Sequence, residues 1–233
     1  MSADTATKFE GLVRARRSPR KFLPEPIPAE QIRAILDDAR HTPSNSNTQP
    51  WMVHIASGAT LQRLSTELVA AYEQGLTSAD FTSTYGDGEY LGRAQRFGAV
   101  YYGVQGIARA DHEGRREVIR KNLRFHGAPH TAFLFMPRLG DGVRAAGDVG
   151  MYAQNFLLSL TARGYAGIPQ AVLGEYADTV RTVLDVSSEF TLSFGISFGY
   201  ADDTSPLRAL NIERVPLARN TVLHDTRGVL DDE

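Results

Sequence analysis

The sequence predicts one α+β domain that spans residues 1–233. Segments whose apolar residues recur at helical spacing and segments with strand-like patterns follow one another in no regular order. The repeated strand–helix–strand order and the glycine fingerprint of a dinucleotide-binding fold are both absent. Apolar residues make up 42% of the chain, which is enough for a substantial core, and no internal repeat divides it.

The first half of the chain contains two predicted helices and a strand. They are helices over 27–42 and 60–73 and a strand over 51–56, with a polar loop at 43–50 before the strand. In the first helix, apolar side chains recur at helical spacing and Pro28 suits the first turn. Pro43 ends this helix because it pushes Thr42 away from helical backbone angles.

The second half contains two further helices and two strands. They are a strand over 131–136, a helix over 148–163, a helix over 175–185 and a strand over 190–200. The helix over 148–163 is apolar nearly all round, which is typical of a buried helix. The last strand alternates strictly between large apolar and small residues, so we expect one face to carry Phe190, Leu192, Phe194, Ile196, Phe198 and Tyr200.

Two segments have weaker patterns. Residues 75–115 are rich in Gly, Asp and Tyr, and we expect a flap with short helices that lines the mouth of a site. Residues 206–233 carry little core-forming pattern, and we expect a C-terminal extension that either wraps a partner subunit or is loose.

Composition excludes several classes of chemistry. The chain has no cysteine, so disulfides, thiolate metal sites and thiol nucleophiles are excluded, and redox chemistry requires a bound cofactor. The formal net charge of -2 does not favour nucleic-acid binding. No run approaches the roughly 20 apolar residues of a membrane span, and the N-terminal segment lacks the apolar stretch of a signal peptide. We therefore expect a cytoplasmic protein that binds neither nucleic acid nor membranes.

Two polar clusters in the first 50 residues are candidates for ligand binding. Arg16, Arg17, Ser18 and Arg20 place three guanidinium groups and a hydroxyl within five positions, a set that suits a phosphate dianion. A solvated basic surface is the alternative. Ser44, Asn45, Asn47 and Gln49 supply donors and acceptors that suit the polar edge of a heteroaromatic ring. The alternative for this second cluster is a turn with a helix cap.

Three other motifs are weaker. Ser197 lies in a formal G-x-S-x-G motif, but the motif is inside a predicted strand and only His224 follows it, so a serine hydrolase is disfavoured. His126 and His130 are separated by Gly127 and Pro129, and no metal-binding spacing occurs. The basic cluster over 115–124 has two interpretations. It is a solvated helix face, or it places the positive charge of Lys121 or Arg124 over a cofactor.

Taken together, these motifs resemble the flavin-dependent nitroreductase family. The pattern begins with R-R-S-x-R, a helix, and P-S-x-x-N-x-Q-P-W leading into a strand. It continues with N-L-R-F-H-G-A-P before the strand over 131–136, G-I-P-Q after the apolar helix, and R-V-P-L after the last strand. The resemblance covers roughly residues 9–224 and is strongest to the nitrobenzoate-reductase-like members.

This resemblance implies a central, mostly antiparallel sheet flanked by helices, in an intertwined homodimer with two FMN sites between the subunits. It assigns FMN contacts in one subunit to Arg16, Arg17, Ser18, Arg20, Arg124, Pro169, Gln170, Ala171 and Arg214. The other subunit would contribute Ser44, Asn45, Asn47 and Gln49. The family often has a second basic residue where this chain has Ile212, so Arg208 or Arg20 is expected to compensate.

The implied reaction is ping-pong reduction of a small nitroaromatic to its hydroxylamine, with NADH or NADPH as hydride donor. FMN carries the chemistry, so no catalytic side chain is assigned. We hypothesise that Tyr85, Tyr90, Arg93, Arg96 and Phe97 line the substrate site, with solvated surface as their alternative. Rival functions on the same scaffold are quinone or enone reduction and reductive dehalogenation, and a further rival is a flavin-binding module without turnover.

Overall fold

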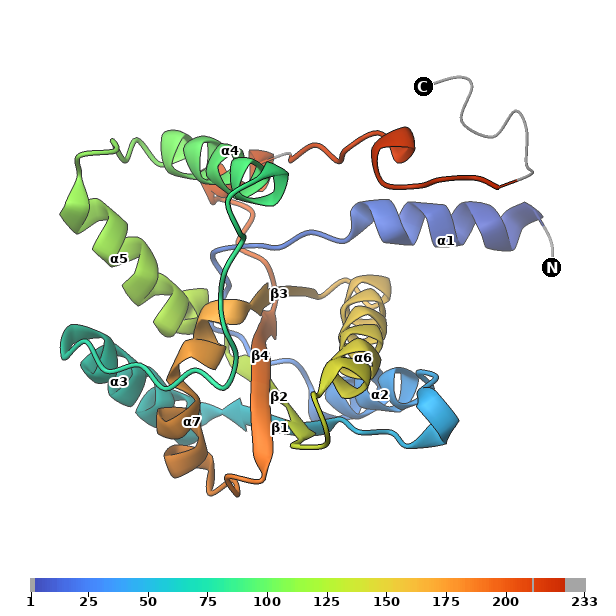
Figure 1. Ribbon diagram of the computed structural model, residues 1–233, viewed down its shortest axis with the longest axis horizontal. Helices are drawn as coiled ribbons and strands as arrows, with labels where there is room; N and C mark the ends of the chain where they lie inside the picture. The colour runs from blue at the N-terminus through green and yellow to red at the C-terminus, as the bar shows by residue number, and fades with distance from the viewer. Residues whose placement is uncertain (1–2, 211, 225–233) are drawn as a thin grey trace.

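The computed structural model describes residues 3–210 and 212–224 (Figure 1). Residues 225–233 of the predicted C-terminal extension lie outside the described residues. The helices are α1 (Ala3–Ala15), α2 (Ala29–Arg40), α3 (Gly58–Glu73), α4 (Glu89–Val104), α5 (His112–Leu123), α6 (Val143–Ala162) and α7 (Ala177–Leu184). The strands are β1 (Met52–Ser57), β2 (His130–Pro137), β3 (Ala166–Gln170) and β4 (Phe190–Gly199).

The four strands form one sheet in the order β1-β2-β4-β3, and every neighbouring pair is antiparallel. The predicted antiparallel sheet in an α+β fold is thus confirmed. Strand β3 lies at an edge, and it was not predicted from the sequence because it contains Pro169. Proline lacks a backbone N–H, and an edge strand tolerates it because one side of that strand has no neighbour.

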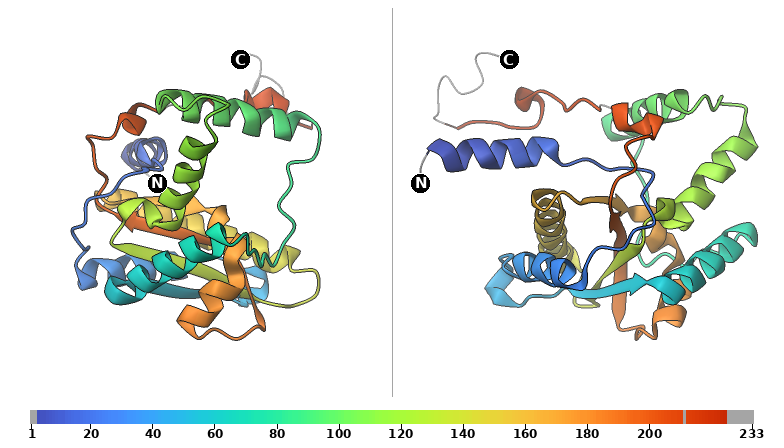
Figure 2. Two further views of the ribbon diagram at one scale, coloured as in Figure 1. Left: turned by 90° about the vertical axis from the view of Figure 1, so that its left-hand side faces the viewer. Right: turned by 180° about the vertical axis from the view of Figure 1, so that it is seen from behind.

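Helices cover both faces of the sheet, so the central strands β2 and β4 are largely buried. Figures 1 and 2 show α3, α5 and α7 over one face and α2 and α6 over the other. The first face packs around Leu64, Leu123, Phe133, Phe135 and Leu173, all of which are almost fully buried. The second face packs around Ile35, Leu134, Val149, Phe156 and Ile196. None of the helices among the described residues is long and apolar enough to cross a membrane.

The strict alternation predicted for 190–200 is wrong at the start of the strand. The pairing with β2 skips Ser193, which is the extra residue of a β-bulge. One extra residue reverses the side on which every preceding side chain lies. Phe190 and Leu192 therefore pack with α3 and α7, whereas Phe194 and the apolar residues that follow it pack with α2 and α6.

Helix α6 begins five positions before its predicted start at residue 148. Gly147 and Gly150 lie in its first turns, and glycine weakens the helical pattern in a sequence. The predicted helix over 175–185 is divided into a short 3-10 turn, Ala171–Tyr176, and helix α7. The predicted helices over 27–42 and 60–73 are confirmed as α2 and α3, with shifts of at most two residues at their ends.

The segment 75–115 contains a longer helix than the short ones predicted. Helix α4 has 16 residues, and an extended connection precedes it. This connection is fixed to the body at its beginning, because the Ser78 amide donates to the carbonyl of Glu175 at 2.9 Å. Helix α1 was not predicted at all. It is largely exposed, and the described part of the C-terminal tail runs beside it (Figures 1 and 2).

The chain between α1 and α2 is tied to the end of β4. Phe22 forms an isolated β-bridge with Ala201, and the Leu23 amide donates to the carbonyl of Tyr200 at 2.9 Å. The Asp202 amide donates to the carbonyl of Lys21 at 3.0 Å. These backbone bonds hold the arginine-rich segment 16–20 at the end of β4, close to β3.

Candidate functional site

A cavity of about 680 Å³ opens where the arginine-rich segment meets the end of β4. One wall is the segment 15–20, and Phe97 of α4 adds an aromatic ring. The end of α6 contributes Thr161, the connection to β3 contributes Tyr165, and residues after β4 complete the wall. These last residues are Ala201, Asp202, Asp203, Ser205, Leu207, Arg208, Leu210, Ile212 and Arg214.

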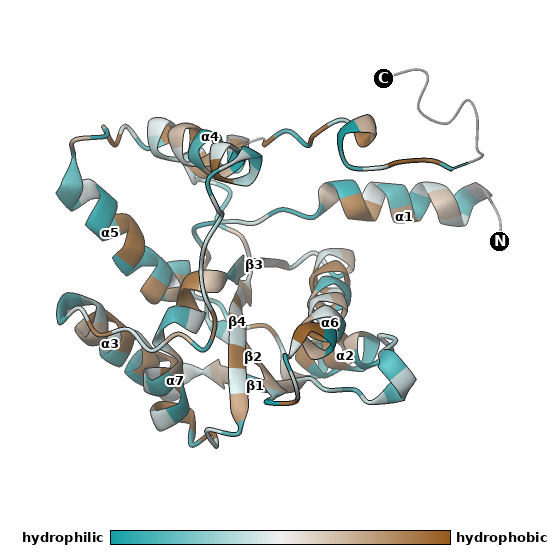
Figure 3. Cartoon of the chain, viewed as in Figure 1, coloured by the Kyte–Doolittle hydropathy of each residue, from teal (hydrophilic) through white to brown (hydrophobic). Residues whose placement is uncertain are grey.

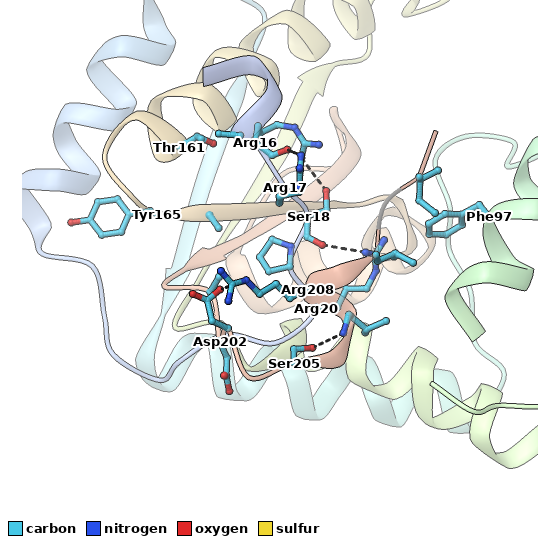
Figure 4. Close-up of a pocket in the computed structure, with 18 of the residues that line it drawn as sticks. Arg16, Arg17, Ser18, Arg20, Phe97, Thr161, Tyr165, Asp202, Ser205 and Arg208 are labelled. Atoms are coloured by element: carbon cyan, nitrogen blue, oxygen red, sulfur yellow. Dashed lines mark hydrogen bonds and ion pairs between the residues drawn. The ribbon is translucent and has the colours of Figure 1, made fainter. Parts of the chain in front are cut away.

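The predicted phosphate-binding residues of this segment lie together in the cavity wall (Figure 4). The Arg16 guanidinium donates to the Ser18 hydroxyl at 3.1 Å, and that of Arg20 donates to the Ser18 carbonyl at 3.1 Å. Arg17 donates to the carbonyl of Arg14 at 2.6 Å. Arg214 lines the same cavity, although it is nearly 200 positions away in the sequence.

The positive charge of this wall is not neutralised by the protein. Among the described residues, no carboxylate lies within ion-pair distance of Arg16, Arg17, Arg20 or Arg214. Burial lowers the pKa of Arg16, and the charges of Arg214 and Arg17 lower it further. Cations that repel one another in a half-buried wall gain free energy when an anion binds between them. The site is therefore suited to an anionic ligand.

A second cavity, of about 440 Å³, lies on the other side of Arg20. It is lined by Arg124, Lys121 and His126 at the end of α5, and by residues of α4 and the tail. The predicted cofactor residue Arg124 is thus placed in this second cavity and not in the first. Its guanidinium is exposed and lies 3.2 Å from a carboxylate oxygen of Glu117.

His126 forms a neutral part of the second wall. Burial lowers its pKa to about 3, and the charges of Arg20 and Lys121 contribute to the shift. Its Nε2 atom lies 3.1 Å from the Asn122 Oδ1 atom, and the Asn122 amide nitrogen donates to the Val118 carbonyl. Nε2 must therefore carry the proton in this hydrogen bond.

The amide-rich loop lies at a different place in the molecule. It connects α2 to β1 (Figure 1). None of its residues lines either cavity. Figure 3 shows this loop as hydrophilic. Asn45, Asn47 and Gln49 are exposed, and Ser46, Asn47 and Gln49 have positive φ angles. Such backbone angles cost free energy in non-glycine residues and often occur where a loop is shaped for binding.

The loop is held in place by a carboxylate that the sequence analysis did not single out. The Asn45 amide donates to both carboxylate oxygens of Asp148, at 3.3 and 3.2 Å. The Gln49 amide donates to the Ser44 hydroxyl at 2.9 Å. Asp148 is buried inside the apolar helix α6. A buried charge requires partners, so this aspartate in an otherwise apolar helix was a usable signal.

Comparison with known proteins identifies the scaffold. The sequence profile described as the Nitroreductase family matches residues 13–200. The chain belongs to the nitroreductase family. It is 43% identical over 224 residues to the nitroreductase NfnB of Mycolicibacterium smegmatis, with 94% of each chain covered. It is 32% identical over 209 residues to a 4-nitrobenzoate reductase of Pseudomonas putida, with 88% of this chain and 91% of the relative covered.

Solved structures of nitroreductases agree with this assignment. The crystal structure of the FMN-dependent nitroreductase NfnB from Mycobacterium smegmatis in complex with NADPH superimposes with a TM-score of 0.91. That match covers 94% of this chain and 99% of the other, at 43% identity. An FMN- and NADPH-dependent nitroreductase NfnB from a Sphigopyxis strain superimposes with a TM-score of 0.88 at 28% identity, covering 93% of this chain and 99% of the other.

The nitroreductase motif G-I-P-Q forms β3, and its glutamine points into the protein. Gln170 is only 2% exposed, and its amide nitrogen donates to the Asn122 carbonyl at 2.9 Å. Its amide oxygen accepts a hydrogen bond from the hydroxyl of Ser197, which is itself fully buried. Of the three residues predicted near the flavin ring, Pro169 and Ala171 are exposed, whereas Gln170 is buried.

The same hydrogen bonds explain the G-x-S-x-G motif of this nitroreductase. The Ser197 hydroxyl lies 3.0 Å from that of Thr131 and bonds to Gln170, so it joins strands β2, β4 and β3 inside the sheet. Gly195 in the motif faces Leu173, which leaves no room for a larger side chain. The motif therefore serves packing inside the sheet, in agreement with the prediction that disfavoured a serine hydrolase.

The five hypothesised substrate-lining residues are distributed over α4 and the connection before it. Phe97 lines the first cavity. Tyr85 and Tyr90 are 63% and 69% exposed, and neither lines a cavity. The Arg93 guanidinium lies 2.5 Å from a carboxylate oxygen of Glu89, and the Arg96 side chain is exposed. Among the described residues, no group of three acidic or histidine side chains is arranged to hold a metal ion.

Proposed function

We propose that this chain is an FMN-dependent NAD(P)H nitroreductase that acts as a homodimer on small nitroaromatic compounds. The observation that carries the proposal is the row of arginines without acidic partners on the wall of a cavity of about 680 Å³. It occurs in a chain that is 43% identical to an FMN-dependent nitroreductase.

The residues present fit the phosphorylated end of FMN. Arg16, Arg17, Ser18 and Arg214 would hold the phosphate, because guanidinium groups donate paired hydrogen bonds to phosphate oxygens. Arg20 would lie at the pyrimidine edge of the ring, and Pro169 and Ala171 near its reactive nitrogen. The family often has a second basic residue in the C-terminal tail, and this chain has Ile212 at that position. Arg208 and Arg20 both line this cavity; Arg208 lies 3.3 Å from a carboxylate oxygen of Asp203, whereas Arg20 has no ion pair among the described residues.

A second subunit would complete the site. The cavity contains none of the exposed amides of the α2–β1 loop, and this loop is strained and turned to solvent. Both facts fit a homodimer in which Ser44, Asn45, Asn47 and Gln49 of one copy meet the arginine wall of the other. The described tail beside α1 is a candidate for contacts between the copies.

Bound FMN would accept a hydride from the nicotinamide and deliver electrons to the nitro group. The role of this chain is to position reactants and stabilise charge. Arg20, without an acidic partner, would stabilise the negative charge that develops on the pyrimidine edge. Two NADPH and two protons convert a nitro group into a hydroxylamine and one water, so the nicotinamide supplies every electron. No side-chain nucleophile is required.

The donor and the substrate class are taken from the relatives. A structure of the relative from Mycobacterium smegmatis contains NADPH, and the relative from Pseudomonas putida is a 4-nitrobenzoate reductase. We therefore expect NADPH to serve as donor and 4-nitrobenzoate to serve as acceptor, with NADH as a comparison. The segment 75–115 is proposed to line the mouth of the site, and a cytoplasmic location stays a prediction.

The absorption spectrum of the purified protein tests this function. We expect a yellow protein whose flavin band is bleached by NADPH without oxygen and restored by 4-nitrobenzoate. Arg16→Ala should lose most of the flavin, whereas Arg40→Ala, an exposed change on α2, should keep it. A colourless protein that takes up no FMN at micromolar concentrations would refute the proposal.

The same experiment separates the rival functions. A protein that binds FMN but does not oxidise NADPH with any acceptor would be a flavin-binding module. Reoxidation by quinones, enones or halogenated phenols, and not by nitroarenes, would place the chain in another branch of reactions on the same scaffold.

A further inference from the structure

Arg20 is held by two aromatic rings of α4. Its guanidinium carbon lies 4.7 Å from the ring centre of Tyr101 and 5.5 Å from that of Phe97. The two rings are themselves stacked, with centres 5.7 Å apart and planes 7° apart. Phe97 and Tyr101 are four positions apart, so they occupy adjacent turns on one face of the helix. Both rings therefore contact the same guanidinium.

This contact lies between the two cavities. Arg20 lines both of them, Phe97 lines the first, and Tyr101 lines the second. Tyr101 is only 7% exposed, so the ring is not free to turn away. The aromatic pair therefore fixes the guanidinium at the boundary where the proposed pyrimidine edge of FMN would lie.

The aromatic contact takes the place of a carboxylate partner for this half-buried arginine. Burial lowers the pKa of Arg20, and the electrostatic interaction with Tyr101 partly opposes this shift. A ring face attracts a guanidinium without neutralising it, because the attraction comes from the quadrupole of the ring. The stacked guanidinium also keeps its N–H groups at its edge. One donates to the Ser18 carbonyl at 3.1 Å, and the others have no acceptor among the described residues.

We propose that Phe97 and Tyr101 are positioning residues that orient the Arg20 guanidinium and leave its charge available to the reduced flavin. This inference rests on the proposed function and assigns Phe97 a role other than contact with substrate. A carboxylate at this place would pair with Arg20 and cancel its effect on the flavin. The aromatic pair also fixes the orientation of the Arg20 guanidinium, but it does not neutralise its positive charge.

The test compares FMN binding in both oxidation states. We expect the double variant Phe97→Leu/Tyr101→Leu to weaken the binding of oxidised FMN modestly and that of reduced FMN by about five- to thirty-fold, the range expected for two partly buried cation–π contacts. Unequal losses lower the midpoint potential of bound FMN, which dye equilibration measures. Tyr101→Phe retains the ring and should keep the wild-type potential.

A matched control lies on the same helix. Tyr102 stacks on Arg115 of α5 at 4.2 Å, so Tyr102→Leu removes a contact of the same kind that lines neither cavity. We expect this variant to keep the wild-type potential. If the double variant does not fold, as judged by circular dichroism, the single change Tyr101→Leu replaces it.

Three outcomes are decisive. An unequal loss in the double variant, with both tyrosine controls unchanged, supports the inference. An equal loss of oxidised and reduced FMN, or no loss, overturns it, because a purely structural role of α4 leaves the potential unchanged. A wild-type protein that binds no FMN in either state refutes the proposed function itself, which distinguishes the two failures.

Discussion

Asp80 shows how one buried carboxylate orders a segment that has no regular pattern in the sequence. Its side chain is 6% exposed and pairs with Arg181, whose two nitrogens lie 2.5 and 3.0 Å from its oxygens. It also bonds to Arg138 and accepts the Leu192 amide at 2.9 Å. Burial opposes the charge, but these hydrogen bonds outweigh it, and the pKa of Asp80 is lowered. The connection before α4 is thereby fixed to β4 and α7.

We predict that Asp80→Ala lowers the free energy of unfolding by about 3 kcal/mol, because it leaves Arg181 and the Leu192 amide with fewer buried partners. Urea denaturation at pH 7 measures this loss. Because the folded pKa is depressed, the stabilisation is present above the unfolded value of 3.8 and is lost as the pH falls through the folded value.

Asp37→Ala is the matched control for this prediction. Asp37 pairs with Arg40 at 2.7 Å on an exposed face of α2, where the side chains are 58% and 66% exposed. Exposed pairs contribute about 0–1 kcal/mol, so we expect little change. Equal effects of the two substitutions would contradict the anchoring role of Asp80.

At the scale of elements, a helix or strand could be predicted from the sequence where its buried residues recur at a simple period. Where they do not, the element was missed. Helices α2 and α3 were predicted because their buried residues recur at helical spacing. Strand β3 was missed because Pro169 is tolerated only at an edge, and the edge position is a property of the whole sheet. The bulge at Ser193 was missed because a β-bulge depends on the partner strand.

We predict that Gly195→Ala destabilises the sheet by about 1–3 kcal/mol, as overpacking of a core does. An added Cβ would lie 2.4 Å from the Leu173 Cδ1 atom, and Leu173 is fully buried against the same face. Thermal unfolding of the purified protein measures the loss.

Gly103→Ala provides the control for this packing prediction. Gly103 lies inside α4, and nothing is within 4 Å of the added Cβ. Alanine in a helix is favoured over glycine by about 0.5–1 kcal/mol, so we expect slightly higher stability. A Gly195→Ala protein as stable as wild type would show that Leu173 moves aside without cost.

At the scale of the whole molecule, residue types indicated the candidate site but could not indicate its assembly. The arginine segment and the amide loop were recognised from side-chain chemistry and from the family resemblance. Tertiary structure separates these two segments within one chain, and it also places Arg214 beside Arg16. Arg124, which was also predicted to contact FMN, lines the second cavity, and this cavity shares Arg20, Ser205 and Leu207 with the first.

The shared site predicts complementation between two damaged chains. Arg16→Ala alone and Asn47→Ala/Gln49→Ala alone should each reduce FMN binding, because each damages both sites of a homodimer. A heterodimer of these two variants should contain one site with both defects and one site with none. We therefore expect two differently tagged variants, co-expressed and purified through both tags, to bind about one FMN per dimer.

This stoichiometry distinguishes a shared site from a site within one chain. If the arginines and the amides of the same subunit met around the flavin, each chain of the heterodimer would carry one defect, and neither site would be intact. The heterodimer would then bind as little FMN as either variant alone. The ratio of flavin absorbance to protein concentration distinguishes these two results. A damaged site lacks several charge-assisted or amide hydrogen bonds to FMN, so it binds FMN more weakly than an intact site.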